Sequence, residues 1–478
     1  MTLLAEPARP AVVREHPWAP WFAVGTVCFG AFMGQLDASI VTLAFPSLQR
    51  QFHAGLAGVQ WVSLAYLLVL VALLVPVGRV SDRVGRKLVY LAGFVVFTAA
   101  SVGCAAAWSL TVLVGLRVVQ ALGAAMLQAN SVALVVTSVP GDRRRGALGV
   151  QAAAQALGLA IGPAVGGVLV ASVGWRWIFL INLPVGVAAV VAGWFLLPRT
   201  RQRAARSRLD LPGVLLLAVT VVAVLTAASA VSGLRLPTGT TPVLVVLAVA
   251  AGAVLIRWER SVPDPLLDPS MLVSRPFGPA LLGALAGYLV LFGPLVLFPQ
   301  VLATEATATA HTGALLTALP AGFGLAAATG ERVLPSDWSN RRRCVGGALL
   351  AAAVCGGLAV PAEPTAVRAV LLAALGIGLG VFIPANNAVM MAALPGERAA
   401  TGGGMVNMMR GLGTALGVAV VTLALHLTGV PAAGTALAMG VLAGCAVLAA
   451  LTGLTSPDGS GGATAVRRPQ RGATAGRG

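Results

Sequence analysis

Charged residues are scarce in this sequence, and acidic residues are the scarcest. Only 10% of the 478 residues are charged and 58% are hydrophobic, whereas a soluble domain carries about 25% charged residues. The mean hydropathy of +0.90 is too high for a surface kept in water, which argues against a soluble enzyme. Lys and Arg number 32 against 15 Asp and Glu. In a soluble protein this excess would indicate a nucleic-acid partner, so the positions of the charges matter.

Sulfur and imidazole ligands are also few. The five cysteines lie apart from one another in apolar stretches, and the four histidines share no metal-binding spacing. The chain contains no Walker or Rossmann glycine pattern, no HExxH and no paired carboxylates in its apolar runs. We therefore expect no catalysis, no metal and no cofactor.

Long apolar runs dominate what is present. Each is long enough for a membrane-spanning helix, which needs about 20 apolar residues, and none has the alternating ten-residue pattern of a membrane barrel. They predict an all-α integral membrane protein with fourteen transmembrane helices, at residues 19–45, 58–78, 87–107, 109–138, 146–171, 176–197, 211–232, 241–257, 277–302, 312–330, 344–361, 365–394, 401–427 and 432–453.

The basic residues fall on one side of this predicted topology. With both termini on the same side, 26 Lys and Arg lie on that side and 4 on the other. Loops rich in Lys and Arg stay in the cytoplasm, so we expect both termini to be cytoplasmic. This placement accounts for the net charge of +17 without nucleic acid.

The chain repeats itself at an offset of 255 residues. Pro140 to Arg143 returns as Pro395 to Arg398 with one acid exchanged, and Asp82 returns as Asp337. Residues 20–197 thus map onto 275–452. We expect a cytoplasmic tail at 1–18, a six-helix bundle at 19–197, a linker with two extra helices at 198–276, a second six-helix bundle at 277–453 and a disordered cytoplasmic tail at 454–478. Repeated halves around a cavity are typical of transporters.

A loop between the second and third runs carries the first chemical motif. Its glycines permit close approach and unusual dihedral angles, and Asp82 can bind an arginine or a helix N-terminus. The alternative is a basic loop that only sets topology. The candidate gating residues are Gly78, Asp82, Arg83, Gly85, Arg86 and Lys87.

With this loop and four further motifs the sequence closely resembles the major facilitator superfamily, in its fourteen-helix drug:proton antiporter branch. The first helix reads Leu-Asp-Ala-Ser-Ile-Val at 36–41, and the fourth Arg-x-x-Gln-Ala-x-Gly at 117–123. The sixth opens with Trp-Arg-Trp-x-Phe-x-Ile-Asn at 175–182. The resemblance implies two six-helix repeats plus two central helices in a bacterial cytoplasmic membrane. In the second half the loop motif is degraded, because Gly330 precedes Asp337 by seven residues instead of four.

The fifth helix contains the antiporter signature of that family. Three of its glycines recur every fourth residue and share one face, which lets another helix approach closely. The alternative is a packing seam alone. The resemblance implies that the segment favours exchange, and it comprises Gly158, Gly162, Pro163, Gly166 and Gly167.

Asp37 is the only acid deep inside a predicted span, and such a residue is a functional candidate. Asp37 and Arg117 each lie about 12 Å from the outer end of their helix at 1.5 Å per residue, so the two can pair. Desolvation favours the neutral carboxyl, whereas a neighbouring arginine favours the carboxylate. A carboxyl that alternates between these environments takes up and releases a proton. A static structural pair is the alternative.

Other polar residues inside the spans are candidates for the cavity lining. Gln155 and Arg410 are related by the repeat and should face each other. If Arg117 neutralises Asp37, Arg410 remains an unbalanced charge, which favours neutral or weakly acidic substrates over dications. The candidates are Gln60, Tyr66, Gln120, Gln128, Asn130, Gln151, Gln155, Asn386, Asn387, Asn407 and Arg410.

The sequence therefore predicts a monomeric exporter in membrane lipid, which moves small amphipathic drugs or antibiotics by alternating access. Its partners would be the small-molecule substrate and protons, with the proton gradient as energy source and no nucleic acid. The alternatives are an importer or uncoupled facilitator of a small metabolite, and a membrane receptor or scaffold that does not transport.

Overall fold

The computed structural model describes residues 6, 8–200, 210–231, 237, 239–263, 265–302, 309–335, 337–360 and 364–455. The side chains of residues 56, 57, 163 and 302–314 also lie outside this description. The predicted disorder of the tail 454–478 concerns residues that are almost all outside it.

The described residues are helical and contain no strand, as an apolar chain requires when lipid offers its backbone no hydrogen-bond partners. The first half comprises α1 (Ala11–Arg14), α2 (Ala19–Ile40), η2 (Val41–Ala44), α3 (Phe45–Phe52), α4 (Leu56–Val84), α5 (Arg86–Ala106), α6 (Leu110–Ser138), η3 (Gly141–Arg143), α7 (Arg144–Ser172), α8 (Trp177–Leu180) and α9 (Asn182–Leu196). The linker comprises α10 (Leu211–Val231), α11 (Thr240–Glu259) and α12 (Pro269–Val273). The second half comprises α13 (Phe277–Leu302), α14 (Thr309–Val333), α15 (Asn340–Leu358), α16 (Thr365–Ala392), η4 (Gly396–Arg398), α17 (Ala399–Thr428) and α18 (Pro431–Gly453).

Twelve helical segments of the described chain are long and apolar enough to cross a membrane, which makes this a multi-pass membrane protein. Helices α14 and α15 are not among them. Helix α15 begins with three arginines after Asn340, and α14 ends with Glu331 and Arg332. The predicted count of fourteen is therefore not reached on length and apolarity alone, because these two helices carry charge at the end of the bundle where their connection turns.

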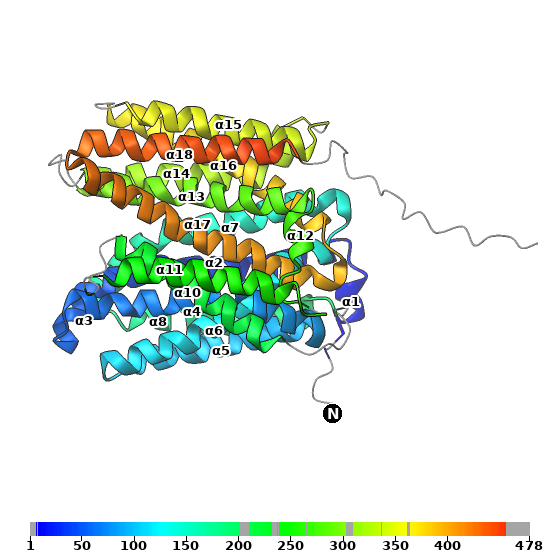
Figure 1. Ribbon diagram of the computed structural model, residues 1–478. Coiled ribbons are helices and arrows are strands. Elements are labelled where there is room, and N and C mark those ends of the chain that lie inside the picture. Colours follow the sequence, from blue (N-terminus) through cyan, green and yellow to red (C-terminus); the bar gives the residue numbers. More distant parts are fainter. Residues whose placement is uncertain are drawn as a thin grey trace, which may run out of the picture.

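The helix boundaries repeat at the same offset as the sequence. Adding 255 to the bounds of α6 gives 365–393, and α16 spans Thr365–Ala392. The short helices η3 and η4 coincide under this shift. In Figure 1 the second half lies above the first, with all long helices running roughly along one direction.

The extra helices α10 and α11 lie beside the contact between the two halves. Helix α10 packs on α11, α4 and α17. Only 6% of the most apolar stretch of α11 is buried, so α11 presents almost its whole surface outward. The pair covers one side of the junction between the halves (Figure 1).

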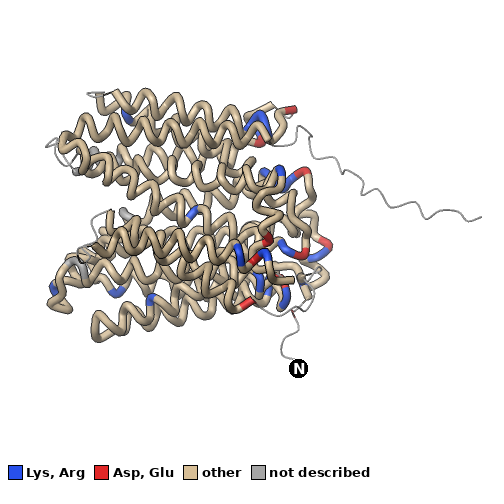
Figure 2. Tube along the Cα trace, in the orientation of Figure 1, with Lys and Arg blue, Asp and Glu red and all other residues tan. Residues whose placement is uncertain are grey.

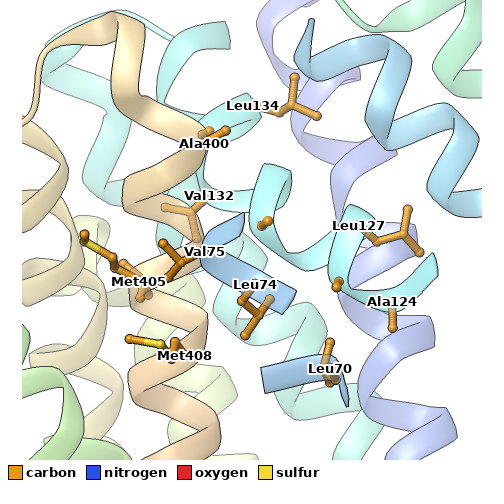
Figure 3. Packing of buried hydrophobic residues seen from close by; sticks show 14 of the residues in the cluster. Leu70, Leu74, Val75, Ala124, Leu127, Val132, Leu134, Ala400, Met405 and Met408 are labelled. Atoms are coloured by element: carbon orange, nitrogen blue, oxygen red, sulfur yellow. The ribbon is translucent and has the colours of Figure 1, made fainter. Parts of the chain in front are cut away.

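The two halves share a continuous apolar core. Leu74 and Val75 of α4 belong to one buried cluster with Met405 and Met408 of α17, and Figure 3 shows these side chains gathered between the two helices. Gly404 of α17 lies against the backbone of Leu74. A Cβ atom at this position would clash with the Leu74 carbonyl oxygen, so only glycine permits this close approach. Helices α4 and α17, one from each half, are therefore in tight contact here.

Charge is concentrated at one end of the bundle. Most Lys, Arg, Asp and Glu residues of the described chain lie at the right-hand end of the bundle, and few lie elsewhere (Figure 2). We refer to this as the basic end. The asymmetry expected from the sequence is thus present in three dimensions.

Candidate functional site

Asp37, the acid that the sequence places inside the first span, forms an ion pair with Arg117, as their similar estimated depths suggested. Asp37 Oδ2 accepts a hydrogen bond from Arg117 Nη1 of α6 at 2.7 Å. Its Oδ1 accepts from Gln120 Nε2 at 3.0 Å and from Asn182 Nδ2 at 3.2 Å. Asp37 and Arg117 are each only 1% exposed. Because α6 and α9 of the first half supply all these partners, the site lies within one bundle.

Arg117 separates Asp37 from open space. Its Nε donates to the Val62 carbonyl oxygen at 3.0 Å, and its guanidinium lies 4.1 Å from the centre of the Tyr66 ring. Arg117 and Tyr66 both line the central cavity, whereas Asp37 does not. In this conformation Asp37 therefore lies behind Arg117 and does not face the cavity.

The central cavity lies between the two halves and has a volume of about 240 Å³. Leucine and valine side chains form much of its wall, and hydroxyl, amide and guanidinium groups project among them. The lining residues are Gly34, Gln35, Ala38, Ser39, Ser63, Tyr66, Leu67, Leu70, Val71, Leu74, Arg117, Gln128, Leu159, Phe292, Asn407, Arg410, Gly411 and Thr414. An apolar cavity with few polar groups is the usual form of a small-molecule site.

A smaller cavity adjoins it and brings in Gln155. Gln35, Leu159, Phe292 and Arg410 line both spaces, and Gln155 lines only the smaller one. Gln155 of α7 and Arg410 of α17 thus border one cavity from opposite halves, as their relation through the repeat suggested.

Gln128 connects the halves at the cavity wall. Its side-chain oxygen accepts a hydrogen bond from Arg410 Nη2. Its backbone oxygen accepts from Asn407 Nδ2 at 2.7 Å. Of the predicted cavity residues, the central and adjoining cavities therefore include Tyr66, Gln128, Gln155, Asn407 and Arg410.

The other predicted cavity residues lie elsewhere in this conformation. Gln120 binds Asp37, Asn130 donates to Ser81 Oγ at 2.8 Å, and Asn386 donates to the Ala280 carbonyl oxygen at 2.8 Å. These are helix–helix hydrogen bonds, which satisfy buried amides. The remaining three do not line either cavity: Gln60 borders a separate pocket beside α10, and Gln151 and Asn387 are buried.

Four polar cavity residues were missed from the sequence. Gln35 and Ser39 flank Asp37 on α2, Ser63 precedes Tyr66 by three residues, and Thr414 follows Arg410 by four. Residues three or four apart share a helix face. For Ser63 and Thr414 the spacing to Tyr66 and Arg410 was the available signal. Gln35 and Ser39 are four residues apart and share a face with each other, but not with Asp37.

The loop motif forms a buried contact between the halves, which we call the Asp82 latch. Asp82 Oδ1 accepts from the Ala400 backbone N–H at 2.9 Å, and Oδ2 accepts from the Thr401 N–H and hydroxyl at 2.8 Å. Arg86 Nε donates to Asp82 at 2.9 Å, and Arg86 Nη2 donates to the Gly396 carbonyl oxygen. A carboxylate at the start of α17 also meets the positive end of the helix dipole.

The remaining motif residues support this latch in different ways. Gly78 faces Thr401, whose Cα would lie 2.9 Å from an added Cβ. Gly85 has φ 131°, a conformation available to glycine, and it separates α4 from α5. Lys87 Nζ donates to the carbonyl oxygens of Trp194 and Leu197 at 2.7 and 2.9 Å. Arg83 lies at the end of α4.

A second contact joins the halves at the same end, the Glu331–Arg145 contact. Arg145 at the start of α7 donates to both oxygens of Glu331 on α14, at 2.9 Å for Nη2 to Oε2. Arg145 Nη1 also donates to Asn340 Oδ1 at 3.0 Å. The two contacts close the basic end of the bundle.

The glycine face of α7 packs on the helix that carries Asp37. A Cβ on Gly158 would lie 3.2 Å from the Leu36 backbone N, and a Cβ on Gly162 would meet Ser39. A Cβ on Gly166 would lie 2.8 Å from Leu43 Cδ1, whereas Gly167 has open space. Three of the motif glycines thus hold α7 against α2 and η2. Pro163 belongs to α7, but its side chain lies outside the described residues.

Metal chemistry has no candidate centre in the described residues. No group of three or more His, Cys, Asp or Glu is arranged to hold a metal ion there. All five cysteines are free thiols. The arrangement can bind a small molecule, hold a proton and change its access, which are the operations of a carrier.

Known proteins resemble the chain over most of its length. The family model described as Major Facilitator Superfamily matches residues 27–418. The methylenomycin A resistance protein of Streptomyces coelicolor is 32% identical over 409 residues, which cover 84% of each chain. The riboflavin transporter RibZ of Clostridioides difficile is 29% identical over 401 residues, 84% of this chain and 87% of RibZ. The tetracenomycin C resistance and export protein of Streptomyces glaucescens is 29% identical over 418 residues, 85% of this chain and 76% of that protein.

A solved structure has the same fold. The crystal structure of the human organic anion transporter MFSD10 (TETRAN) aligns with a TM-score of 0.65 at 17% identity, covering 92% of this chain and 100% of that chain.

Proposed function

Because the chain belongs to the major facilitator superfamily, whose members carry small molecules across membranes, we propose that it exports small amphipathic drugs or antibiotics in exchange for protons. Similarity to resistance proteins for methylenomycin A and tetracenomycin C supports export. The cavity between the halves and the contacts that join the halves at the basic end support alternating access.

The observation that carries the proposal is the buried Asp37–Arg117 pair beside the cavity. In the present conformation Asp37 accepts hydrogen bonds from three donors. When the pair with Arg117 opens in the absence of substrate, the desolvated carboxyl takes up a proton. When substrate binds in the cavity, which Arg117 and Tyr66 line, the pair forms again and the proton is released, so that substrate and proton compete as exchange requires.

The coupling test measures protons directly. Protein in detergent receives a transported compound, and the protons exchanged are followed with a pH indicator in weakly buffered solution. Wild type releases protons on binding, because substrate and proton compete for the site. Asp37→Asn keeps the side-chain shape, binds the compound and exchanges none, whereas the control Asp337→Asn at the exposed surface behaves as wild type. Equal proton exchange by Asp37→Asn would show that another group carries the proton.

Direction of transport is tested in cells. Expression in a drug-sensitive bacterium lowers accumulation of at least one amphipathic compound, and a protonophore restores it. Similarity to the riboflavin transporter RibZ supports the second candidate, import or uncoupled movement of a metabolite. Higher accumulation on expression, or export that ignores the protonophore, would favour this second candidate.

We further propose fourteen crossings in the bacterial cytoplasmic membrane, with both termini in the cytoplasm and the protein monomeric. Helices α14 and α15 have 25 and 19 residues and pack on α16, which is itself long and apolar. The concentration of arginine at one end supports the orientation. A reporter fused after residue 454 is active only if it is cytoplasmic, and single cysteines at the two ends of α14 react from opposite sides of the membrane.

A further inference from the structure

Arg410 is the one cavity residue whose charge the described part of the site leaves unbalanced. It lies on α17, is 7% exposed and borders both cavities. Its guanidinium donates a hydrogen bond to the neutral side-chain oxygen of Gln128. An amide oxygen satisfies a hydrogen bond of the guanidinium but does not compensate its charge.

Among the described residues, no carboxylate lines the cavities beside Arg410. The residues that line the two cavities include Arg117 and Arg410 but neither Asp nor Glu. Arg117 is already paired with Asp37 at 2.7 Å, and Arg410 forms no ion pair with a described acid. The binding space therefore carries one net positive charge.

A buried cation in the middle of a membrane protein is costly without a counter-ion or water. Arginine keeps its proton under all ordinary conditions, so this site does not relieve the cost by neutralising itself. An anion that enters the cavity relieves it, and a guanidinium binds a carboxylate through two parallel hydrogen bonds.

The rest of the cavity determines what kind of anion fits. Leu67, Leu70, Val71 and Leu74 of α4 form one apolar wall, and Leu159 and Phe292 contribute from the other side. Such walls bind a hydrocarbon or aromatic body and do not replace the hydration of a small inorganic ion. The volume of about 240 Å³ suits a compact organic molecule.

We propose that Arg410 binds the acidic group of the transported compound, and that the substrates are amphipathic organic acids with one carboxylate or similarly acidic group. This inference rests on the proposed function and assigns its substrate class. It separates the two charges of the cycle: Asp37 in the first half carries the proton, and Arg410 in the second half binds the anion. A structural role for Arg410, limited to its hydrogen bond with Gln128, is the alternative outcome.

The test uses probes that share one body and differ in charge. Binding of 1-naphthaleneacetic acid, 1-naphthaleneacetamide and 1-naphthylmethylamine to the purified full-length protein in uncharged detergent is measured by calorimetry at neutral pH. Fusidic acid and its methyl ester repeat the comparison with a larger body. We expect each acid to bind at least tenfold more tightly than its neutral partner, and the amine to bind most weakly.

Three variants assign the preference to a residue. Arg410→Gln reduces the preference for the acid to less than twofold. Arg410→Lys keeps the charge but loses the two-pronged geometry, so acid affinity falls at least threefold while amide affinity stays within twofold. Arg368→Gln removes another buried arginine of the second half, outside the cavity, and leaves the preference unchanged. If Arg410→Gln does not fold, the Lys variant decides alone.

The inference is overturned if neither acid binds, if the amide or amine binds as tightly, or if Arg410→Gln retains the preference. The proposed function fails differently. If acids bind in a manner that depends on Arg410 but cells do not export them, the inferred ligand class is supported and the proposed export is refuted. If cells export compounds in a proton-coupled manner without any preference for acids, the proposed export is supported and the inferred role of Arg410 is refuted.

Discussion

Two aspartates related by the internal repeat, Asp82 and Asp337, have opposite environments. Asp82 is fully buried and binds the start of α17. The Asp337 side chain is 75% exposed, and its contact is Arg342 at 3.8 Å. The duplication preserved the residue type but not its role, because the contact depends on the helix that lies opposite.

The second half closes the basic end with a different residue. Glu331, six positions before Asp337, reaches Arg145 at the start of α7. Its side chain is 31% exposed and that of Arg145 is 22% exposed, so water screens this contact far more than the Asp82 latch. We infer that the closure is asymmetric: one contact is buried and strong, and the other is adjustable.

Removing the charge of the buried latch gives the largest expected effect. Asp82→Asn leaves Arg86 without its carboxylate and places an amide group against backbone N–H donors. Breaking one partner of a buried ion pair costs about 3–5 kcal/mol. We expect transport at least tenfold below wild type with normal expression. If Asp82→Asn transports as well as wild type, the loop has no role in gating and only sets the membrane topology.

A steric change at the same latch comes next. Gly78→Ala places a Cβ 2.9 Å from Thr401 Cα and against the Ala400 carbonyl oxygen. We expect transport to fall about fivefold, because roughly 1 kcal/mol of strain in the closed state changes its population about that much. The control is Gly330→Ala, where an added Cβ meets nothing within 4 Å. Equal effects of the two variants would contradict the asymmetry.

The adjustable contact should respond more weakly. Glu331→Gln removes the charge that pairs with Arg145 and also with Arg343. The Glu331 and Arg145 side chains are 31% and 22% exposed, and ion pairs that water screens contribute about 0–1 kcal/mol. We expect transport to change about two- to threefold at low salt, and less at 0.5 M salt because of screening. A tenfold loss on Glu331→Gln would mean that the two contacts are equivalent.

The smallest effect is expected at the exposed aspartate. Asp337→Asn removes one exposed charge, and surface substitutions of this kind change stability by less than about 0.5 kcal/mol. Transport and thermal stability should stay within error of wild type. A loss comparable to that of Asp82→Asn would show that Asp337 binds another element in a different conformation.

Several structural features could be predicted from the chain alone. Apolar runs predict helices because lipid allows few alternatives, and distance along a helix converts directly into depth. Asp37 and Arg117 could therefore be paired without a structure. It could also be predicted that Asp82 binds an arginine or a helix N-terminus, whereas the packing of the halves decided that this helix is α17.

Only the tertiary structure decided which polar side chains face the cavity. Gln128 and Asn130 are two residues apart on α6, yet one lines the cavity and the other binds Ser81. The rotation of each helix about its axis depends on its neighbours, as in the glycine contact of α7 with α2. The pairing of Glu331 with Arg145 has the same cause. The two residues are far apart in the sequence, and only the packing of α14 against α7 brings their side chains together.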